Sequence, residues 1–301
     1  MPERVPVQVG DGHTMTLSHL DKPLWPGFTK GQALHYYAQI APVLLPHTAG
    51  RPASFVRFPD GIDGPRFYAK NPPPGLPSWV HTAPVPGKDG SRDHVVLNAL
   101  GDLMAMGNLY GLEIHVPQWT TDAGPGAHDR LVIDLDPGDG AGMPQCAAVA
   151  LLVQRELAAD GLTTWVKTSG SKGLHLYAPI TGATGDQATA YARRLAERLA
   201  REHPDLVVAK MTKALRAGRV FLDASQNATS KTTAAPYTLR AVDPVAVSAP
   251  VRWSEAEDAA EGAPLSFTPP QVLERMTTDG DLLAGMLNRH TAAVLPVGTH
   301  D

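Results

Sequence analysis

Two aspartates, Asp134 and Asp136, are the residues whose type and spacing most directly suggest chemistry. They lie in the segment LVIDLDPGDG at 131–140, whose apolar and β-branched residues predict a short buried strand. Side chains at i and i+2 of a strand share a face, about 7 Å apart, and Pro137 with Gly138 predicts that the strand ends there. Two like charges at this rim repel each other, and Mg²⁺ or Mn²⁺ between them would relieve the conflict. The alternative is a turn in which Asp136 caps the next helix and Asp134 is solvated.

A glycine-bounded loop follows a predicted strand at 165–168 and carries Ser169, Lys172 and His175. Glycine-rich turns expose backbone N–H groups, and the serine and lysine add a hydroxyl and a cation, which together suit a phosphate. The loop is not a Walker A motif, because GxxxxGK[ST] is absent and a strand follows it. The alternative is a hairpin with a chance lysine.

A third carboxylate, Asp223, ends another predicted strand at 219–223. Three strand-end carboxylates could hold two divalent cations, as two-metal sites do. The glycine-bounded loop could hold a triphosphate, and Arg240 would add charge neutralisation. The combination is typical of metal-dependent nucleotidyl transfer, in which a 3′-hydroxyl attacks an α-phosphate and pyrophosphate leaves.

Near the N-terminus, Thr29 and Gln32 have the spacing of a capping box, which predicts a helix that ends near Pro46. Lys22 and Lys30 flank the turn before this helix. Helix starts favour anions, so the two lysines are candidates for a phosphate pocket, although loop lysines are commonly just solvated.

Residues 51–70 alternate basic and aromatic side chains. Basic residues suit phosphates and aromatic faces suit unstacked bases, but a hairpin with core aromatics and rim arginines is the alternative. Residues 71–93 are rich in proline and glycine and predict a long exposed loop. A strand at 112–119 places His115 on the face opposite Ile114, and Asp186 is predicted to cap a helix over 187–203.

The 301 residues suffice for one large domain or two fused modules. The net charge of −4 neither demands nor excludes nucleic acid. One cysteine, Cys146, excludes an internal disulfide and a cysteine-based zinc site. No segment predicts a membrane span or a signal peptide.

Three long segments, RLVIDLDPGDG, VKTSGSKGLHLYAP and GRVFLDASQNATSKTTAAPYTLRA, resemble the motifs of the polymerase domain of bacterial DNA ligase D. That domain is a primase-polymerase of the archaeo-eukaryotic primase superfamily. The resemblance runs from about Val5 to Leu287 and includes LDKPLWP, RPASFVRFPDGIDGPRFYAKNPPPG and LEIHVPQW. It implies an α/β (α+β) fold, with an RRM-like catalytic sheet and flanking helices packed on a smaller N-terminal α/β module. The expected single domain covers 1–288, with modules at about 1–110 and 111–288 and a flexible tail at 289–301.

The resemblance also implies a function, template-directed polymerisation with a ribonucleotide preference, using two Mn²⁺ or Mg²⁺ ions. The expected partners are NTP or dNTP and gapped or broken DNA with a 5′-phosphate, as in non-homologous end joining. Ku or a ligase is a further expected partner. The chain is expected to be a monomer in the cytoplasm, near the nucleoid, and either a stand-alone relative or a fragment of a larger ligase.

Site residues carry over from the resemblance by position. The metal ligands are Asp134, Asp136 and Asp223, and the 5′-phosphate residues are Lys22 and Lys30. The expected nucleotide contacts are His115, Ser169, Lys172, His175, Gln226 and Arg240. The aromatic residues expected to stack on the template are Phe67 and Tyr68, and the accessory arginine is Arg216.

The sequence departs from the family pattern at two positions near these site residues. His19 stands where Asn is common, beside the 5′-phosphate residues, and Val56 stands where Lys is common. The second departure predicts a ribonucleotide preference that persists but is reduced.

Two other functions remain alternatives. A metal-dependent glycosyltransferase that uses a nucleotide sugar would explain Asp134 and Asp136, but not Asp223, the two lysines or the aromatics. A catalytically idle scaffold that binds DNA ends would explain the basic residues, but it has no need for three clustered carboxylates.

Overall fold

A computed structural model describes residues 4–87 and 90–296. The chain forms two compact units, each built from separate stretches of sequence. Unit 1 comprises Met1–Pro117, Thr233–Ser248 and Phe267–Gly280, and unit 2 comprises Gln118–Thr232, Ala249–Ser266 and Asp281–Asp301. The chain therefore enters each unit three times. The single domain and the module limits expected from the sequence stay predictions.

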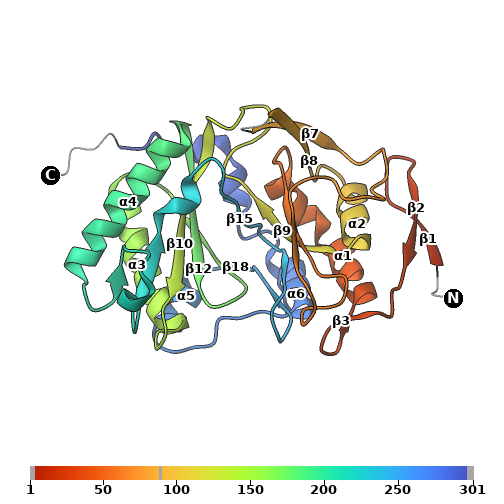
Figure 1. Cartoon of the computed structure of the whole chain (residues 1–301). Coiled ribbons are helices and arrows are strands. Elements are labelled where there is room, and N and C mark those ends of the chain that lie inside the picture. Colours follow the sequence, from red (N-terminus) through yellow and green to blue (C-terminus); the bar gives the residue numbers. More distant parts are fainter. Residues whose placement is uncertain (1–3, 88–89, 297–301) are drawn as a thin grey trace. The chain divides into compact units, whose positions relative to one another are not determined.

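Unit 1 combines helices with a four-stranded sheet (Figure 1). Its helices are α1 (Lys30–Thr48), α2 (Leu100–Asn108) and α6 (Pro269–Asp279). The sheet order is β15 (Thr233–Ala234), β9 (Gly111–Val116), β5 (Ser54–Arg57) and β6 (Phe67–Ala69). Four two-stranded pairs complete the unit: β1 (Arg4–Gln8) with β2 (Thr14–Ser18), β3 (Pro23–Trp25) with β4 (Phe28–Thr29), β7 (Thr82–Gly87) with β8 (Gly90–Val95), and β16 (Leu239–Arg240) with β17 (Ala246–Val247).

The capping box predicted at the start of α1 is confirmed. Thr29 Oγ1 accepts the backbone N–H of Gln32, and Gln32 Oε1 accepts that of Thr29. The helix runs to Thr48, past the predicted end near Pro46, and contains Pro42 as well. Its inward face is fully buried, so packing against the core maintains a helix whose intrinsic propensity these prolines lower.

Unit 2 contains a six-stranded sheet with its own helices. The strand order is β13 (Val207–Val208), β14 (Val220–Asp223), β10 (His128–Pro137), β12 (Leu174–Ala183), β11 (Trp165–Thr168) and β18 (Pro250–Val251). The helices are α3 (Met143–Ala159), α4 (Gly185–Glu202) and α5 (Trp253–Ala260). Short 3₁₀ turns complete the unit: η1 (Lys213–Leu215), η2 (Ala224–Asn227), η3 (Ala284–Leu287) and η4 (Arg289–Thr291).

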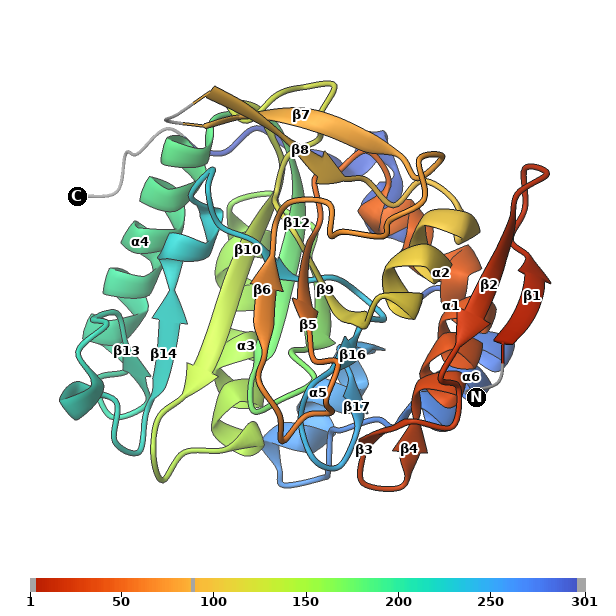
Figure 2. The ribbon, with the colours of Figure 1, turned by 45° about the vertical axis from the view of Figure 1, so that its right-hand side comes forward.

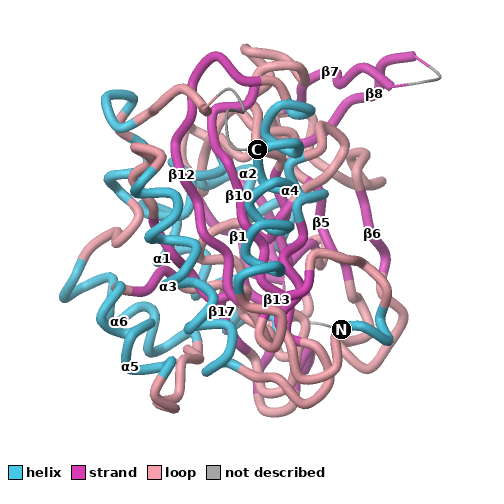
Figure 3. The backbone as a smooth tube through the Cα atoms, turned by 90° about the vertical axis from the view of Figure 1, so that its left-hand side faces the viewer, coloured by secondary structure: helices cyan, strands magenta, loops and turns pink. Residues whose placement is uncertain are grey.

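The centre of unit 2 is the antiparallel pair β10 and β12, which lie side by side in Figures 2 and 3. Leu131, Val132, Ile133 and Leu135 of β10 are all buried, so both faces of this strand are covered. Helices α3 and α4 pack against it. The strand predicted at 131–136 is therefore confirmed, and it begins three residues earlier, at His128.

Two local expectations were wrong. The stretch 71–93 is not a single loop, because β7 and β8 pair over much of it as a hairpin (Figure 3). Helix α4 is capped by Thr184, whose hydroxyl accepts the N–H of Gln187, while Asp186 lies within the first turn. An acidic residue there still complements the positive end of the helix dipole.

Part of the expected C-terminal tail has defined contacts. Residues 289–291 form η4, and the Ala293 backbone donates to the Pro179 carbonyl and accepts the Thr181 N–H, both on β12. Residues 297–301 lie outside the described residues. The helices that the structure describes are each too short or too polar to cross a membrane.

Candidate active site

Four polar side chains form a row across neighbouring strands of unit 2. In the sheet register Asp223 of β14 lies opposite Asp134 of β10, which lies opposite His175 of β12, which lies opposite Lys167 of β11. Residues directly opposite in antiparallel strands point to the same face, with Cβ atoms about 5 Å apart. All four are buried. A buried row of ionisable groups lowers stability unless its members satisfy one another, so we expect it to serve a function.

The row is linked by polar contacts. His175 Nε2 lies 3.2 Å from Asp134 Oδ1, and Lys167 Nζ lies 3.0 Å from His175 Nδ1. An ammonium only donates, so Nδ1 is the acceptor and Nε2 carries the proton toward Asp134. Lys167 therefore fixes the tautomer and orientation of the histidine that touches the first aspartate.

Asp223 is held by two donors from the turn that follows it. Its Oδ1 accepts the N–H of Ser225 at 2.9 Å, and its Oδ2 accepts Gln226 Nε2 at 3.1 Å. The predicted nucleotide contact Gln226 thus touches a predicted metal ligand. These bonds fix the position of the carboxylate at the end of β14.

Asp136 lies two residues beyond Asp134 on the same face and is exposed. Phe221 lies opposite it, and the guanidinium of Arg216 stacks on the Phe221 ring at 3.8 Å. Arg216 also donates to the Met211 carbonyl at 2.7 Å. Arg216, the accessory arginine predicted from the sequence, is thereby oriented beside Phe221, which lies opposite Asp136.

The glycine-bounded loop is closed by its own serine. Ser169 Oγ accepts the N–H groups of Ser171 and Gly173 at 3.2 and 3.1 Å, and the Ser169 N–H donates to Gly173 at 2.8 Å. Lys172 is exposed at the loop tip. Gly173 packs against the Leu135 carbonyl so closely that a Cβ would overlap it. The absence of a side chain at Gly173 therefore allows the loop to pack against β10.

The donor set suits Mg²⁺ or Mn²⁺, because three carboxylates lie on one face of two neighbouring strands. Within residues 4–87 and 90–296, however, no three His, Cys, Asp or Glu side chains are arranged as a ready metal shell. In this structure Asp134 and Asp223 make hydrogen bonds or ion pairs with protein donors. Metal binding would require these carboxylates to exchange some of those partners for the cation.

Unit 1 contains a second polar cluster, centred on Glu113 of β9. Glu113 Oε1 lies 2.8 Å from His115 Nε2 and 3.3 Å from Arg240 Nε, while Oε2 accepts the N–H of Ala241 at 2.8 Å. Two predicted nucleotide contacts, His115 and Arg240, are thus joined by one carboxylate. Burial acts to raise the pKa of Glu113, but the hydrogen bond from His115, the charges of Arg240 and His115 and the Ala241 N–H outweigh it and lower the pKa to about 2.

Lys22 and Lys30 share a partner, the ring of Tyr110. Their ammonium groups lie 5.5 and 4.5 Å from its centroid. Lys22 also pairs with Asp60 at 3.2 Å. Lys30 is fully buried, so it is not an ordinary solvated lysine, and it donates to Ser18 O and Asn108 Oδ1 at 2.7 and 2.8 Å. Burial, and then the charge of Lys22, lower the pKa of Lys30 to about 8.

The aromatic residues of 51–70 divide into two groups. Phe55 and Phe58 are core residues, whereas Phe67 and Tyr68 on β6 are each 52% exposed. The Tyr68 ring packs edge-on against His115, with centroids 6.0 Å apart. Exposed rings are what stacking on bases requires.

The arginines of residues 51–70 donate hydrogen bonds to backbone carbonyls. Arg51, Arg57 and Arg66 donate to the carbonyls of Pro117, Leu109 and Ile62. The alternative of a hairpin with structural arginines therefore applies to them, while the two exposed rings fit the nucleic-acid interpretation.

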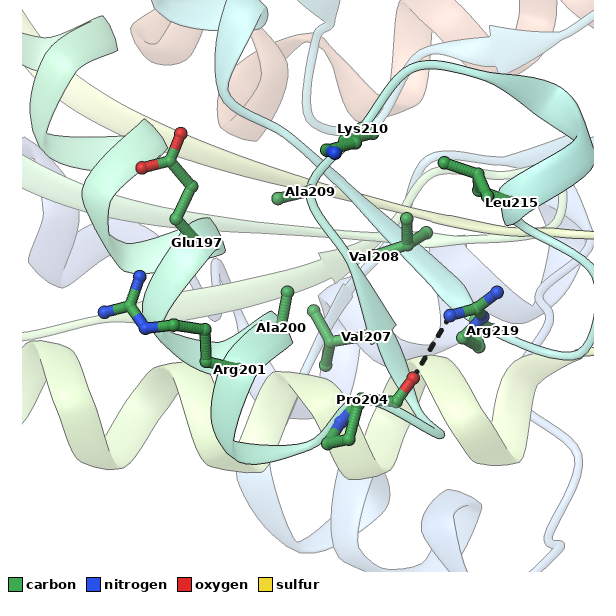
Figure 4. A pocket seen from close by; sticks show the side chains of 10 residues that line it. All are labelled: Glu197, Ala200, Arg201, Pro204, Val207, Val208, Ala209, Lys210, Leu215 and Arg219. Atoms are coloured by element: carbon green, nitrogen blue, oxygen red, sulfur yellow. Dashed lines mark hydrogen bonds between the residues drawn. The ribbon is translucent and has the colours of Figure 1, made fainter.

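The predicted site residues therefore fall into two sets. Unit 2 contains Asp134, Asp136, Ser169, Lys172, His175, Arg216, Asp223 and Gln226, and unit 1 contains Lys22, Lys30, Phe67, Tyr68, His115 and Arg240. A cavity of about 430 Å³ on unit 2, between the end of α4 and β13 (Figure 4), contains none of them in its lining. Its side chains are Glu197, Ala200, Arg201, Pro204, Val207, Val208, Ala209, Lys210, Leu215 and Arg219.

A family model of the LigD primase-polymerase domain matches residues 29–283. The chain belongs to this family. It is 44% identical over 279 residues to the multifunctional non-homologous end joining DNA repair protein LigD of Mycobacterium tuberculosis, and 30% identical over 254 residues to the bifunctional LigD of Bacillus subtilis. These matches cover 89% and 84% of this chain but only 36% and 40% of the two relatives.

The same family relation appears in three dimensions. The polymerase domain of M. tuberculosis ligase D, solved in complex with DNA, superposes with a TM-score of 0.85 at 43% identity, over 91% of this chain and 98% of that one. The α/β fold and the family expected from the sequence are thus confirmed. The chain corresponds to one domain of its longer relatives.

Sequence reasoning missed three residues of these clusters: Lys167, Glu113 and Tyr110. Lys167 and Glu113 lie two residues from loop or strand positions that were chosen, Ser169 and His115. Same-face spacing of i and i+2 in a strand would have pointed to Glu113 from His115. Tyr110 joins the lysines only through the tertiary fold.

Proposed function

We propose that this LigD primase-polymerase domain is a template-directed nucleotidyltransferase that fills gaps at DNA ends and prefers ribonucleotides. The observation that carries the proposal is the placement of Asp223 directly opposite Asp134, with Asp136 next along the same face. Family membership supports polymerisation over sugar transfer. Activity on broken DNA within end joining is proposed from what the relatives are named for.

In this mechanism Asp134, Asp136 and Asp223 would hold two Mn²⁺ or Mg²⁺ ions. The ions would supply a lowered pKa for the attacking 3′-hydroxyl and charge stabilisation for the leaving pyrophosphate. Ser169 shapes the loop, and exposed Lys172 neutralises triphosphate charge. His175, oriented by Lys167, holds Asp134 in place. His115 and Arg240 stay predicted nucleotide contacts.

On the DNA side, Lys22 and Lys30 are proposed to bind the downstream 5′-phosphate, and Phe67 and Tyr68 to stack on template bases. Arg216 is proposed as an accessory group during end joining. Ku or a ligase remains a proposed partner, and a monomer the proposed state.

The deciding experiment is primer extension on a gapped duplex with Mn²⁺ or Mg²⁺. The single variants Asp134→Asn, Asp136→Asn and Asp223→Asn should each lower the extension rate by at least about a hundredfold, because each removes a metal ligand. Asp139→Asn, which changes an exposed carboxylate three residues past Asp136, should extend normally.

Three other outcomes would contradict this proposed function. Extension by the Asp134→Asn and Asp136→Asn variants at the wild-type rate would refute two-metal catalysis. Wild-type protein that binds the gap but never extends it would be the idle scaffold. A higher kcat/KM for dUTP than for UTP opposite the same template base would contradict the proposed ribonucleotide preference.

A further inference from the structure

The Glu113 cluster contains a charged group that no step of the proposed reaction uses. The Glu113 side chain is 9% exposed, whereas the side chains of its two partners, His115 and Arg240, are 16% and 17% exposed. A buried carboxylate that touches two partly exposed donor side chains has one clear physical effect, which is to fix where those side chains lie.

We propose that Glu113 is a positioning residue that orients His115 and Arg240 for the incoming nucleotide. This inference rests on the proposed function, in which those two residues contact the nucleotide. Glu113 acts through them and touches neither nucleotide nor DNA.

Three contacts of the Glu113 carboxylate support the proposal. Glu113 and His115 are i and i+2 on β9, so they share a face, and their side-chain contact spans 2.8 Å. Arg240 comes from β16, more than a hundred residues later in the chain, and approaches the same oxygen at 3.3 Å. The other oxygen accepts the Ala241 N–H at 2.8 Å, which ties the backbone next to Arg240 to the same carboxylate.

The chemistry follows from the charge of Glu113. A carboxylate held ionised only accepts, so His115 Nε2 must be the donor. The ring orientation is thereby fixed, with Nδ1 on the edge away from Glu113. Val56, opposite Glu113 on β5, is apolar, so charge compensation at this carboxylate comes from His115, Arg240 and the Ala241 N–H.

The kinetic test is a set of Glu113→Gln variants in two backgrounds. Glutamine keeps the shape but removes the charge, so the KM for NTP should rise at least about tenfold. The Kd for gapped DNA should stay within about twofold. In a His115→Ala plus Arg240→Ala background the same substitution should change kcat/KM by less than about threefold, because the groups it acts through are gone.

Glu156→Gln is the matched control. It removes another glutamate from an ion pair, with Arg198 on α4 in unit 2, whereas His115 and Arg240 belong to unit 1. Its nucleotide KM should equal that of the wild type. An equal loss from Glu113→Gln in both backgrounds, or an unchanged nucleotide KM, would overturn the proposal and leave Glu113 a structural residue.

A second measurement needs neither a mutant at Glu113 nor catalysis. In protein labelled with ¹⁵N-histidine, with His115→Gln to assign the signal, the His115 Nε2 resonance should be that of a protonated nitrogen. A ring that exchanges between tautomers, or that is protonated only on Nδ1, would refute the assignment. If the wild type never extends a primer, the proposed function fails, while this measurement and direct nucleotide binding still test Glu113.

Discussion

The properties of single residues in this protein depend strongly on burial, and Lys30 shows this most clearly. Its ammonium is held by Ser18, Asn108 and the Tyr110 ring within a fully buried position. Burial and the nearby Lys22 lower its pKa to about 8. In the free protein Lys30 is therefore mostly charged at pH 7 and mostly neutral at pH 9.

This pKa predicts a pH dependence for recognition of DNA ends. If Lys30 binds a 5′-phosphate, the phosphate favours the charged lysine, so affinity must fall as pH rises through and above 8. The preference for a 5′-phosphorylated over a 5′-hydroxyl gap should drop about three- to tenfold between pH 7 and pH 9. Fluorescence anisotropy at fixed ionic strength measures both affinities.

Lysine-to-arginine variants provide the controls. Arginine stays charged throughout this range, so Lys30→Arg should remove the pH dependence, whereas Lys22→Arg should retain it. A wild-type preference that is the same at pH 7 and pH 9 would take Lys30 out of the phosphate pocket.

His19 illustrates what a residue-level departure can mean. Its φ is +56°, in the left-handed region that favours Gly and Asn. The asparagine that is common at this position in the family thus has a backbone reason. The histidine side chain is exposed.

At the scale of elements, the register between strands decides the site, and glycines permit it. Gly173 lies against the Leu135 carbonyl, within the strand that carries both aspartates. Gly138 likewise lies against the Arg216 carbonyl. Side chains at these two positions would push the glycine-bounded loop and the Arg216 segment away from the end of β10.

Gly173→Ala should therefore move the loop and raise the KM for NTP several-fold while gapped-DNA affinity is kept. The overlap is with backbone, so a loss of about 1–3 kcal/mol in stability should accompany it. Gly126→Ala is the control, since a Cβ there meets no atom within 4 Å. Steady-state kinetics and thermal unfolding measure the two effects, and identical behaviour of the two variants would contradict this role for the loop.

Local signals in the sequence predicted individual helices and strands well, but they predicted poorly which strands pair. The capping box at Thr29, the strand at 165–168 and the strand that ends after Asp136 were all readable, because each depends on neighbours in sequence. The β7–β8 hairpin was not, because Pro84, Pro86 and Gly87 have low strand propensity.

Contacts across strands were the harder part. The row Asp223, Asp134, His175 and Lys167 depends on the register of four strands, which no local pattern encodes. The contact between Glu113 and Arg240 is hidden for the same reason, since Arg240 lies in a distant part of the sequence, although the spacing of Glu113 and His115 is a local signal. The sequence offered Asp134, Asp136 and Asp223 as candidate metal ligands because each lies near the end of a predicted strand, but it did not place Asp223 opposite Asp134.

At the scale of the whole molecule, charge is the relevant property. The chain has 26 lysines and arginines against 30 aspartates and glutamates. A net negative protein gains little from general attraction to DNA, so its binding must come from a few local cations. Each cation that neutralises a phosphate contributes about −0.9 to the slope of log K against log salt concentration.

The salt dependence of binding therefore counts the phosphate contacts. Lys22→Ala and Lys30→Ala should each reduce the steepness of the slope by about 1 on a 5′-phosphorylated gap, and by much less on a 5′-hydroxyl gap. Arg193→Ala, an exposed cation on α4, should leave both slopes unchanged. If the lysine variants altered the two slopes equally, the lysines would bind internal phosphates. If neither slope changed, the anchoring cations would have to be sought elsewhere on the molecule.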